Sequence, residues 1–366
     1  MKINILLPYK ERFDQNQASS VSITVRNNLL HSKYLNQIKI FGQNVENPLF
    51  KNNFVGLKYS ILSFKSKNKF LAYEMSKMIS NDTEKKQLIE IHNRPYLIDE
   101  ISKYNKLPIS LFFHNDPQTM KGSKSVKDRK KIIEKCVAIF CVSEFIKKKF
   151  LEGINKYTKK IHVLYNGVER EVTNFPKKKK EVLFVGRLVP EKGVHLYVET
   201  VKSLVNKYPE WSFGLIGSFR LGANENRNLY SDKIVENFKN IGPQAQFYGF
   251  KDQVFVAEKM KNASIIVIPS IWEEPFGLVA AEAMSNGICI VASKVGGIPE
   301  IIQDNGILIS DINYEKLLAN IDNLIENDFM RHNYQRKAWD NFKFSSSISS
   351  ARLDNFRKII YSNWFR

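Results

Sequence analysis

The chain has 366 residues, of which 43% are hydrophobic and 25% are charged, so it has the composition of a globular protein and room for two cores. No apolar run approaches the roughly 18 residues of a membrane-spanning helix, and the apolar part of the first segment, MKINILLPYKER, is too short for a signal peptide. We therefore expect no membrane span and a cytoplasmic location.

The formal net charge of +19 is the unusual feature of the composition. A basic protein favours polyanions such as nucleic acid, anionic lipid head groups or phosphorylated substrates. An abundance of Lys and Asn is also typical of a low-GC genome, and this neutral interpretation stays open. The cysteines, Cys136, Cys141 and Cys289, lie in apolar surroundings without metal-ligand spacing, which predicts buried free thiols.

In the first half, strand-like and helix-like segments alternate. Strands are predicted at 3–7, 38–41, 87–91, 109–113, 137–142 and 161–164, and helices near 18–31, 64–79, 126–135 and 144–150. This alternation is typical of βαβ units and predicts an α/β fold with a parallel sheet.

Two of these strands end in histidine. His92 follows the strand in IEIHNRP, and His114 follows the strand in LFFHNDP. A single histidine is most often a satisfied core or surface residue, but two at equivalent strand ends are candidates for a site. No His-Glu-x-x-His or comparable ligand pair is present, so we expect no metal.

The second half begins after the turn Asn166-Gly167-Val168 and the lysine run Lys177–Lys180, which we interpret as a linker. Strands are predicted at 181–185, 213–216, 246–248, 265–268 and 288–292, and helices at 193–207, 228–239, 278–285, 314–326, 330–342 and 352–364, with one further helix ending at 262. A serine-rich break is expected at 344–350.

The turn after strand 181–185 carries two cations, Arg187 beside Gly186 and Lys192 beside Gly193. Alone, such a turn is most simply a solvated loop. The stretch from Ser264 to Ile302 contains two carboxylates, Glu274 in a loop and Glu282 inside the following helix. The amides of Phe276, Gly277 and Leu278 lie at that helix's amino end, which favours a bound anion.

One short segment thus offers a phosphate site with a carboxylate on either side, an arrangement that suits a nucleotide sugar. The simpler alternative is an acidic loop next to a solvated helix position. The small residues and the pair Gly296-Gly297 favour the first interpretation, because they imply close backbone packing.

This stretch resembles the retaining glycosyltransferases of family 4, of the type that assembles bacterial cell-envelope polysaccharides. Their signature is Glu, seven residues and a second Glu within E-P-F-G-L-x-x-x-E-A-M-x-x-G, which Glu274 to Gly287 match. Gly296-Gly297-Ile298-Pro299-Glu300 matches the G-G-x-P-E that follows in the family, and Gly186 to Gly193 match G-R-L-x-x-E-K-G. Cys289 stands where many members have Pro.

The resemblance implies a role for each matched residue. Catalytic roles fall to Glu274, which would orient sugar hydroxyls, to His92 on the donor sugar, and to His114 on the acceptor side or the same sugar. Arg187 and Lys192 would hold the donor diphosphate, Glu282 the ribose, and Phe250 or its neighbours the base. The complete expected donor set is Gly186, Arg187, Lys192, Phe250, Pro275, Phe276, Gly277, Leu278 and Glu282, with no metal and no cofactor.

The architecture implied is the GT-B fold, with two doubly wound Rossmann-like domains facing a central cleft. We expect an acceptor-binding domain at 1–172, a nucleotide-sugar-binding domain at 181–344, and a final helix within 345–366 that returns to the first domain. One departure lies in residues 15–20, which contain no glycine where many members have a Gly-Gly near the donor phosphate.

The function implied is transfer of a hexosyl group, with retention, from a nucleotide-diphosphate sugar (we expect a UDP-sugar) to a hydroxyl of a glycan or lipid-linked acceptor in lipopolysaccharide or polysaccharide biosynthesis. The alternatives are a sugar-nucleotide epimerase or phosphorylase on the same fold, and a basic nucleic-acid-binding protein. The last lacks helix-turn-helix, zinc-finger and RNP-like signals, so we expect no nucleic acid.

An anionic membrane surface is a further expected partner, at the inner face of the plasma membrane. One predicted helix of the first half carries a basic cluster with an apolar side formed by Ile132, Ile133 and Val137. The cluster consists of Lys124, Lys127, Arg129, Lys130 and Lys131.

Overall fold

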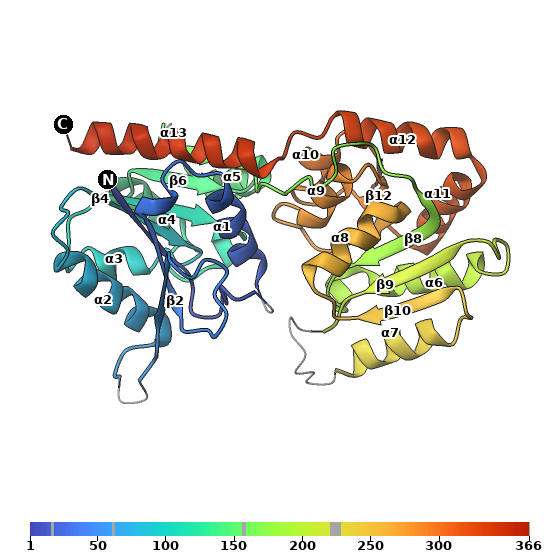
Figure 1. Ribbon diagram of the computed structural model, residues 1–366, viewed down its shortest axis with the longest axis horizontal. Coiled ribbons are helices and arrows are strands. Elements are labelled where there is room, and N and C mark those ends of the chain that lie inside the picture. Colours follow the sequence, from blue (N-terminus) through green and yellow to red (C-terminus); the bar gives the residue numbers. More distant parts are fainter. Residues whose placement is uncertain (16–17, 61–62, 156–158, 220–227, 366) are drawn as a thin grey trace. The chain divides into compact units, whose positions relative to one another are not determined.

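The computed structural model describes residues 1–15, 18–60, 63–155, 159–219 and 228–365. The chain divides into two compact units, the first made of Met1–Gly167 with Ser346–Arg366 and the second of Val168–Ser345 (Figure 1). Each unit is a parallel sheet with helices packed against it, which confirms the predicted α/β class.

The first unit is built on a seven-stranded parallel sheet with the order β3-β2-β1-β4-β5-β6-β7. Its register places Ile5 of β1 opposite Ile40 of β2 and Glu90 of β4. Since all the paired strands run the same way, their carboxyl ends meet at one edge, where ligands bind in such sheets. The strands are β1 Lys2–Leu6, β2 Ile38–Gln43, β3 Phe54–Leu57, β4 Gln87–His92, β5 Ile109–Phe113, β6 Ala138–Cys141 and β7 Ile161–Val163.

Side-chain caps start several helices of this unit. Ser19 accepts a hydrogen bond from the Ser22 amide, Ser143 accepts one from the Ile146 amide, and Ser125 and Asp128 form a capping box. The helices are α1 Ser20–Leu30, α2 Lys67–Ser80, α3 Leu97–Ile101, α4 Val126–Lys135 and α5 Glu144–Leu151, with 3₁₀ turns η1 Leu35–Gln37 and η2 Pro117–Thr119.

The final helix, α13 Ser346–Trp364, belongs to the first unit and packs against α1 and β4 (Figure 1). Its buried Arg357 donates hydrogen bonds to both carboxylate oxygens of Glu90 on β4, each at 2.8 Å, and one to Asp354 at 3.0 Å. Removing one partner of such a buried pair typically costs about 3–5 kcal/mol, so Arg357 ties the end of the chain to the centre of the sheet.

The expectation of a serine-rich break at 344–350 is wrong, because α13 begins at Ser346 and runs through the serines. Ser349 donates to the carbonyl of Tyr165 at 2.9 Å, and Ser350 donates to the carbonyl of Asn28 at 2.8 Å. The buried hydroxyls thus find acceptors in the first unit, and packing outweighs the weak helix propensity of serine.

The second unit is built on a six-stranded parallel sheet with the order β10-β9-β8-β11-β12-β13. Its strands are β8 Lys179–Val185, β9 Ser212–Ile216, β10 Ala245–Gly249, β11 Ala263–Ile268, β12 Cys289–Ser293 and β13 Ile307–Ile309. Its helices are α6 Val194–Leu204, α7 Leu229–Lys239, α8 Gln253–Asn262, α9 Leu278–Ser285, α10 Ile298–Ile302, α11 Tyr314–Glu326 and α12 Asp328–Asp340, with the 3₁₀ turn η3 Pro190–Lys192.

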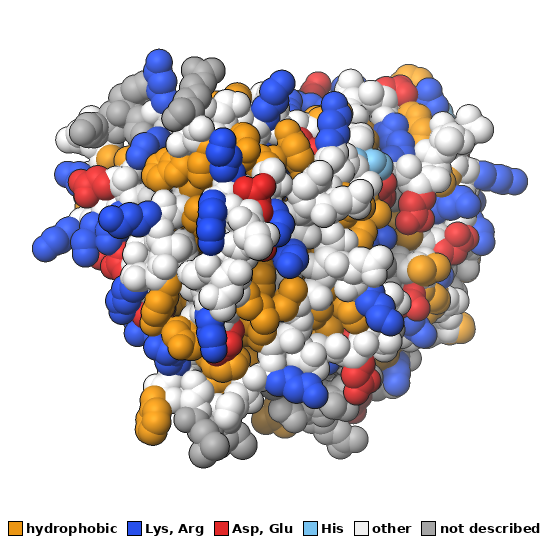
Figure 2. Space-filling model, turned by 60° about the vertical axis from the view of Figure 1, so that its left-hand side comes forward, with side chains coloured by type: hydrophobic (Ala, Val, Ile, Leu, Met, Phe, Trp, Pro, Cys, Tyr) orange, Lys and Arg blue, Asp and Glu red, His pale blue; other side chains and the backbone are white. Residues whose placement is uncertain are grey.

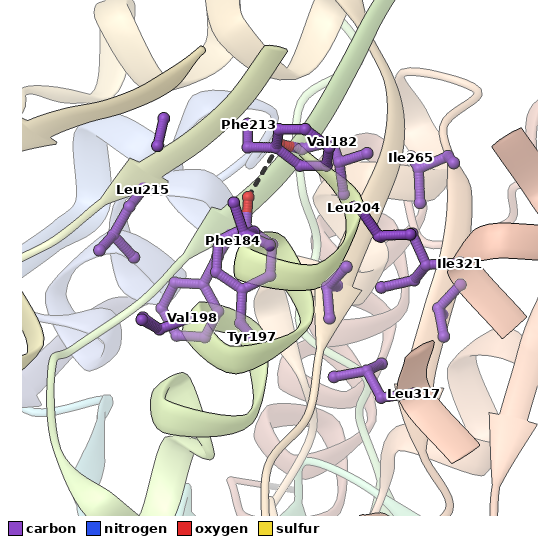
Figure 3. Packing of buried hydrophobic residues seen from close by; sticks show 14 of the residues in the cluster. Val182, Phe184, Tyr197, Val198, Leu204, Phe213, Leu215, Ile265, Leu317 and Ile321 are labelled. Atoms are coloured by element: carbon purple, nitrogen blue, oxygen red, sulfur yellow. Dashed lines mark hydrogen bonds between the residues drawn. The ribbon is translucent and has the colours of Figure 1, made fainter. Parts of the chain in front are cut away.

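Buried aromatic and aliphatic side chains from β8, β9, α6 and α11 form the core of this unit (Figure 3). Tyr197 is fully buried and stacks on Phe184 with ring centroids 5.7 Å apart. Its hydroxyl donates to the carbonyls of Val182 and Gly214, both at 3.0 Å. The one polar atom of this side chain is therefore satisfied, and α6 is held in a defined position above the sheet.

Two further predictions can be compared with the structure. Cys136, Cys141 and Cys289 are buried free thiols, as expected, and burial raises the pKa of Cys136 to about 12. Among the described residues, no helix is long and apolar enough to cross a membrane.

Candidate functional site

The loop after β11 brings Glu274 against Lys192, although the two residues are far apart in the sequence. The Lys192 ammonium donates to Oε1 of Glu274, and the Ser270 hydroxyl donates to the same oxygen at 2.7 Å. Glu274 is 8% exposed, so the ion pair is largely shielded from water. The Ile271 amide also donates to the Glu191 carbonyl at 2.9 Å, which joins the two loops through their backbones.

Glycines make this close approach possible. Gly193 has a φ of 64°, and a Cβ there would lie 1.9 Å from the carbonyl oxygen of Pro269. Gly296 has a φ of 58°, and a Cβ there would lie 2.2 Å from the carbonyl oxygen of Glu274. The backbone packing that the paired glycines predicted is therefore present, and only glycine fits these positions without displacing the Glu274 loop.

Helix α9 begins directly after this loop, with Gly277 as its N-cap and no side-chain cap. Its first amides, those of Leu278 and Val279, have no acceptor within the helix, so its amino end favours an anion. Pro275 and Phe276 are buried, and Phe276 contacts Phe344 with ring centroids 6.0 Å apart. These contacts fix the direction in which the helix starts.

Glu282 lies about one turn into α9 and is partly exposed. Among the described residues its carboxylate has no hydrogen-bond or ion-pair partner, and burial raises its pKa to about 7. A carboxyl group that finds no partner in the described part of the chain can exchange hydrogen bonds with the hydroxyls of a ligand.

The remaining donor-set residues also lie at loops of this unit. Gly186 follows β8, and its amide donates to the Ile216 carbonyl at 3.0 Å. Arg187 is exposed, and no partner of its guanidinium is found in the part of the chain that the structure describes. Phe250 directly follows β10 and is partly buried. All three sit where strands β8 and β10 end.

The structure brings the two predicted histidines together in the first unit. Nδ1 of His92 and Nε2 of His114 are 2.8 Å apart, and the rings stack with centroids 5.0 Å apart. Burial lowers the pKa of His114 to about 4. Burial, His114 and Arg357 together hold the pKa of His92 well below its usual value. Both rings are therefore neutral at pH 7, and one donates a hydrogen bond to the other.

Asn93 is a site candidate that sequence reasoning did not single out. Its φ of 53° is unusual for a residue other than glycine, and its Oδ1 accepts a hydrogen bond from the His114 amide at 2.8 Å. Within the described residues, its buried Nδ2 and Nε2 of His92 have no hydrogen-bond partner. A strained backbone with unpaired buried donors is typical of a ligand site. The sequence pattern that could have indicated Asn93 is that an asparagine directly follows each of the two histidines.

Glu11 is a second such candidate, because burial raises its pKa although Ser19 and Arg94 act in the opposite direction. Ser19 belongs to the glycine-free segment 15–20. Residues 16 and 17 of that segment lie outside the described residues. The prediction that this glycine-free loop departs from the family's donor-phosphate loop therefore stays a prediction.

The basic cluster on α4 requires a correction. Arg129 is 2% exposed and donates to the carbonyls of Ser123, Lys124 and Glu152, at 3.2, 2.8 and 2.6 Å. It is therefore a structural residue that joins the start of α4 to the end of α5, because a long guanidinium side chain reaches several carbonyls at once. The exposed cations are Lys124, Lys127, Lys130 and Lys131.

In the second unit, a fixed lysine, an exposed arginine and an uncapped helix terminus supply positive charge beside two carboxylates. Such a constellation can bind a diphosphate and orient hydroxyl groups on either side of it. Among the described residues, no three or more His, Cys, Asp or Glu side chains group as a metal-ligand set.

Most of this unit matches a known family. Residues 167–340 match the family described as glycosyl transferases group 1. A relative in Methanocaldococcus jannaschii, an uncharacterized glycosyltransferase, is 34% identical over 53% of this chain and 51% of its own length. The lipopolysaccharide 1,2-N-acetylglucosaminetransferase of Salmonella typhimurium is 28% identical over 37% of this chain and 35% of its own. The match therefore spans about half of the first relative and about a third of the second.

A likeness to solved structures extends over nearly the whole chain. The crystal structure of Anabaena HepE in complex with UDP and glucose aligns with a TM-score of 0.75 at 16% identity, over 98% of this chain and 99% of that one. At this identity the likeness concerns the fold, and the chain has the GT-B fold that the sequence resemblance implied.

Proposed function

We propose that the protein is a retaining glycosyltransferase, because residues 167–340 match the family described as glycosyl transferases group 1. It moves a hexosyl group from a nucleotide-diphosphate sugar, with UDP as the expected nucleotide, to a hydroxyl of a glycan or lipid-linked acceptor. The observation that carries the proposal is the ion pair of Lys192 with Glu274, placed directly before the uncapped start of α9.

The donor diphosphate binds at the start of α9, with Lys192 and Arg187 supplying positive charge. An arginine can hold two phosphate oxygens at once, whereas a lysine acts as a point charge. Glu274 orients the hydroxyls of the sugar through Oε2, since Oε1 is occupied by Lys192 and Ser270. Glu282 accepts hydrogen bonds from the ribose, and Phe250 contributes to the base pocket.

In the transfer step, the bond between the anomeric carbon and the leaving phosphate oxygen breaks. The acceptor oxygen bonds to the same face of that carbon, and its proton passes to the phosphate. Negative charge grows on the departing diphosphate, where Lys192, Arg187 and the helix amides stabilise it. Glu274 is a positioning and electrostatic group in this scheme, because Lys192 and Ser270 occupy Oε1 and the sugar hydroxyls occupy Oε2.

His92 and His114 act on sugar hydroxyls as neutral hydrogen-bonding groups. In the pair, one ring nitrogen donates and the other accepts, so a proton can sit on His114 Nδ1 or His92 Nε2 and face a ligand. Their low pKa values keep this neutral form present throughout the physiological range.

For the cellular role, we propose assembly of lipopolysaccharide or another polysaccharide, on a cytoplasmic protein held peripherally at the inner face of the plasma membrane. The name of the Salmonella relative and the net charge of +19 support this assignment. A juxtamembrane cation is worth about 1 kcal/mol near an anionic leaflet, and α4 presents several to solvent.

The test is a thermal-shift screen with UDP-, GDP- and ADP-sugars, since a ligand that binds the native state stabilises it. The donor found is then incubated with candidate acceptors, and the anomeric configuration of the product is read by NMR. Glu274→Gln should bind the donor but lower the turnover rate, with Glu273→Gln as the neighbouring control. An inverted product would refute retention, and an altered donor sugar formed without acceptor would identify an epimerase.

A further inference from the structure

A pocket of about 470 Å³ lies between α2 and α3 of the first unit, and its lining includes none of the site residues discussed so far. Four lysines and one glutamate line it, together with Phe64, Ser66 and Tyr104. We call it the lysine pocket, and its cations are Lys65, Lys69, Lys103 and Lys121. Its volume is within the range of small-ligand sites.

The lysine pocket carries an excess of positive charge. Glu100 is its one acidic group, and its two oxygens take Lys65 at 3.5 Å and Lys103 at 3.2 Å. Burial acts to raise the pKa of Glu100, but the surrounding lysines outweigh it and the pKa is lowered, so the carboxylate is ionised. Lys69 and Lys121 have no ion-pair partner among the described residues, which leaves their charge for a ligand.

Aromatic rings hold two of these cations in place. The Lys65 ammonium lies 4.9 Å from the ring centre of Tyr73, and the Lys121 ammonium lies 5.5 Å from that of Tyr96. Tyr73 in turn contacts Tyr104 edge to face, with centroids 5.3 Å apart. Such contacts reduce the freedom that long lysine side chains lose on binding an anion.

The start of α2 adds a further attraction for anions. Its N-cap, Ser66, makes no side-chain cap, so the first amides of this 14-residue helix are without that acceptor. Figure 2 shows one face of the molecule, on which Lys and Arg side chains are spread among apolar ones with fewer acidic groups between them.

The position of the pocket connects it to the histidine pair within the same unit. The segment after β4 leads from His92 into α3 and Glu100, and the segment after β5 leads from His114 to Lys121. Both of these segments, which contribute residues to the lysine pocket, therefore begin at the carboxyl edge of the sheet, where parallel α/β sheets bind their ligands.

We propose that the lysine pocket binds a phosphate group of the acceptor, so that the substrate to be glycosylated is a phosphorylated molecule. This inference rests on the proposed transferase function. A phosphate or diphosphate matches the ammonium groups that line one pocket beside the start of α2. The hydroxyl-bearing part of the acceptor would then bind at the His92–His114 pair of the same unit.

The test measures pyrophosphate binding by calorimetry in the full chain carrying Arg187→Ala and Lys192→Ala, which removes the donor site as a competitor. Adding Lys69→Gln and Lys121→Gln should weaken binding by roughly tenfold or more. The control adds Lys127→Gln and Lys130→Gln on α4, which removes the same charge from an exposed face. Binding that is absent, or equally weakened by both pairs, would overturn the proposal.

A second measurement uses the unaltered protein. Pyrophosphate should protect Lys69 and Lys121 from reductive methylation, read by mass spectrometry, while Lys127 stays reactive. Equal modification with and without pyrophosphate would overturn the proposal even if the variants failed to fold.

Vesicles distinguish the source of the phosphate. The unaltered protein is tested on phosphatidate vesicles, with phosphatidylcholine vesicles as the control without a free phosphate group. If Lys69→Gln with Lys121→Gln abolishes a phosphatidate-specific binding, the acceptor phosphate is lipid-linked. If only pyrophosphate binding is lost, the acceptor is water-soluble. These binding assays do not depend on turnover. If no nucleotide sugar supports transfer, the proposed transferase function is refuted, and with it the idea that the bound phosphate belongs to an acceptor. Phosphate binding in the lysine pocket would still stand.

Discussion

Glu282→Gln should make the stability of the protein less dependent on pH. Burial raises the pKa of Glu282 from 4.5 to about 7, and no partner among the described residues compensates for its charge. A tenfold change in proton affinity is worth about 1.4 kcal/mol, so this pKa shift can change the free energy of unfolding by at most about 3.5 kcal/mol. Because Glu282 is partly exposed, solvent screens part of this, and we expect about 1–3 kcal/mol.

The sign follows from linkage. A pKa raised in the folded state means that the folded chain holds the proton more tightly than the unfolded chain. The stability from Glu282 is therefore fully present below about pH 4.5 and is lost as the pH rises through about 7. Glutamine imitates the protonated form at every pH. The free energy of unfolding of the variant should therefore rise relative to that of the wild type as the pH increases between these limits.

Urea unfolding at pH 5 and pH 7.5 measures this difference. Tryptophan fluorescence follows mainly the second unit, which holds Trp211, Trp272 and Trp339. Glu315→Gln, at an exposed position on α11, is the matched control and should show no such gain. If the difference between Glu282→Gln and the wild type is the same at both pH values, Glu282 is not desolvated and the reasoning fails.

Three further outcomes are expected. Arg187→Ala and Lys192→Ala should each lower turnover by ~10²-fold, the effect of one lost electrostatic donor, and wild-type turnover in a folded variant would remove that residue from the diphosphate site. Burial lowers the pKa of His114 to about 4, so its stabilising contribution is lost as the pH falls from 6.5 towards 4, and His114→Gln should flatten acid unfolding followed by circular dichroism. Replacing the exposed α4 lysines by glutamine should abolish salt-sensitive co-sedimentation with anionic vesicles, and equal binding to zwitterionic vesicles would contradict membrane attraction; these lysines are Lys124, Lys127, Lys130 and Lys131.

Local sequence patterns were sufficient for most of the fold. Strands of both sheets are apolar runs bounded by turns, and the helices between them have amphipathic spacing and caps, so the alternation could be read directly. Several short elements were missed, among them β3 Phe54–Leu57, β13 Ile307–Ile309 and α3 Leu97–Ile101. Each of these two strands lies at a sheet edge and pairs with one neighbour, β2 or β12, and the helix has little more than one turn, so none repeats a pattern for long enough to be recognised.

The residues of the candidate site were named from motifs, but their contacts were not. Nothing in the local sequence indicates that Lys192 reaches Glu274, or that His92 and His114 share a hydrogen bond. Each pair is brought together by two neighbouring parallel strands. β8 and β11 are neighbours in the sheet although they are not consecutive in the chain, and β4 and β5 are neighbours joined by a crossover connection. Strand order is decided by packing of the whole unit, which a motif does not contain.

The orientation of charged side chains was likewise decided by tertiary structure. Arg129 belongs to a basic run that reads as solvated, yet its guanidinium is buried against three carbonyls. Arg357 and Glu90 are 267 residues apart in the sequence and meet in the interior of the first unit. Burying a charge is favourable only when partners surround it, and these partners come from segments that folding brings together. The sequence therefore determined which groups the protein possesses, and tertiary packing determined which of them meet.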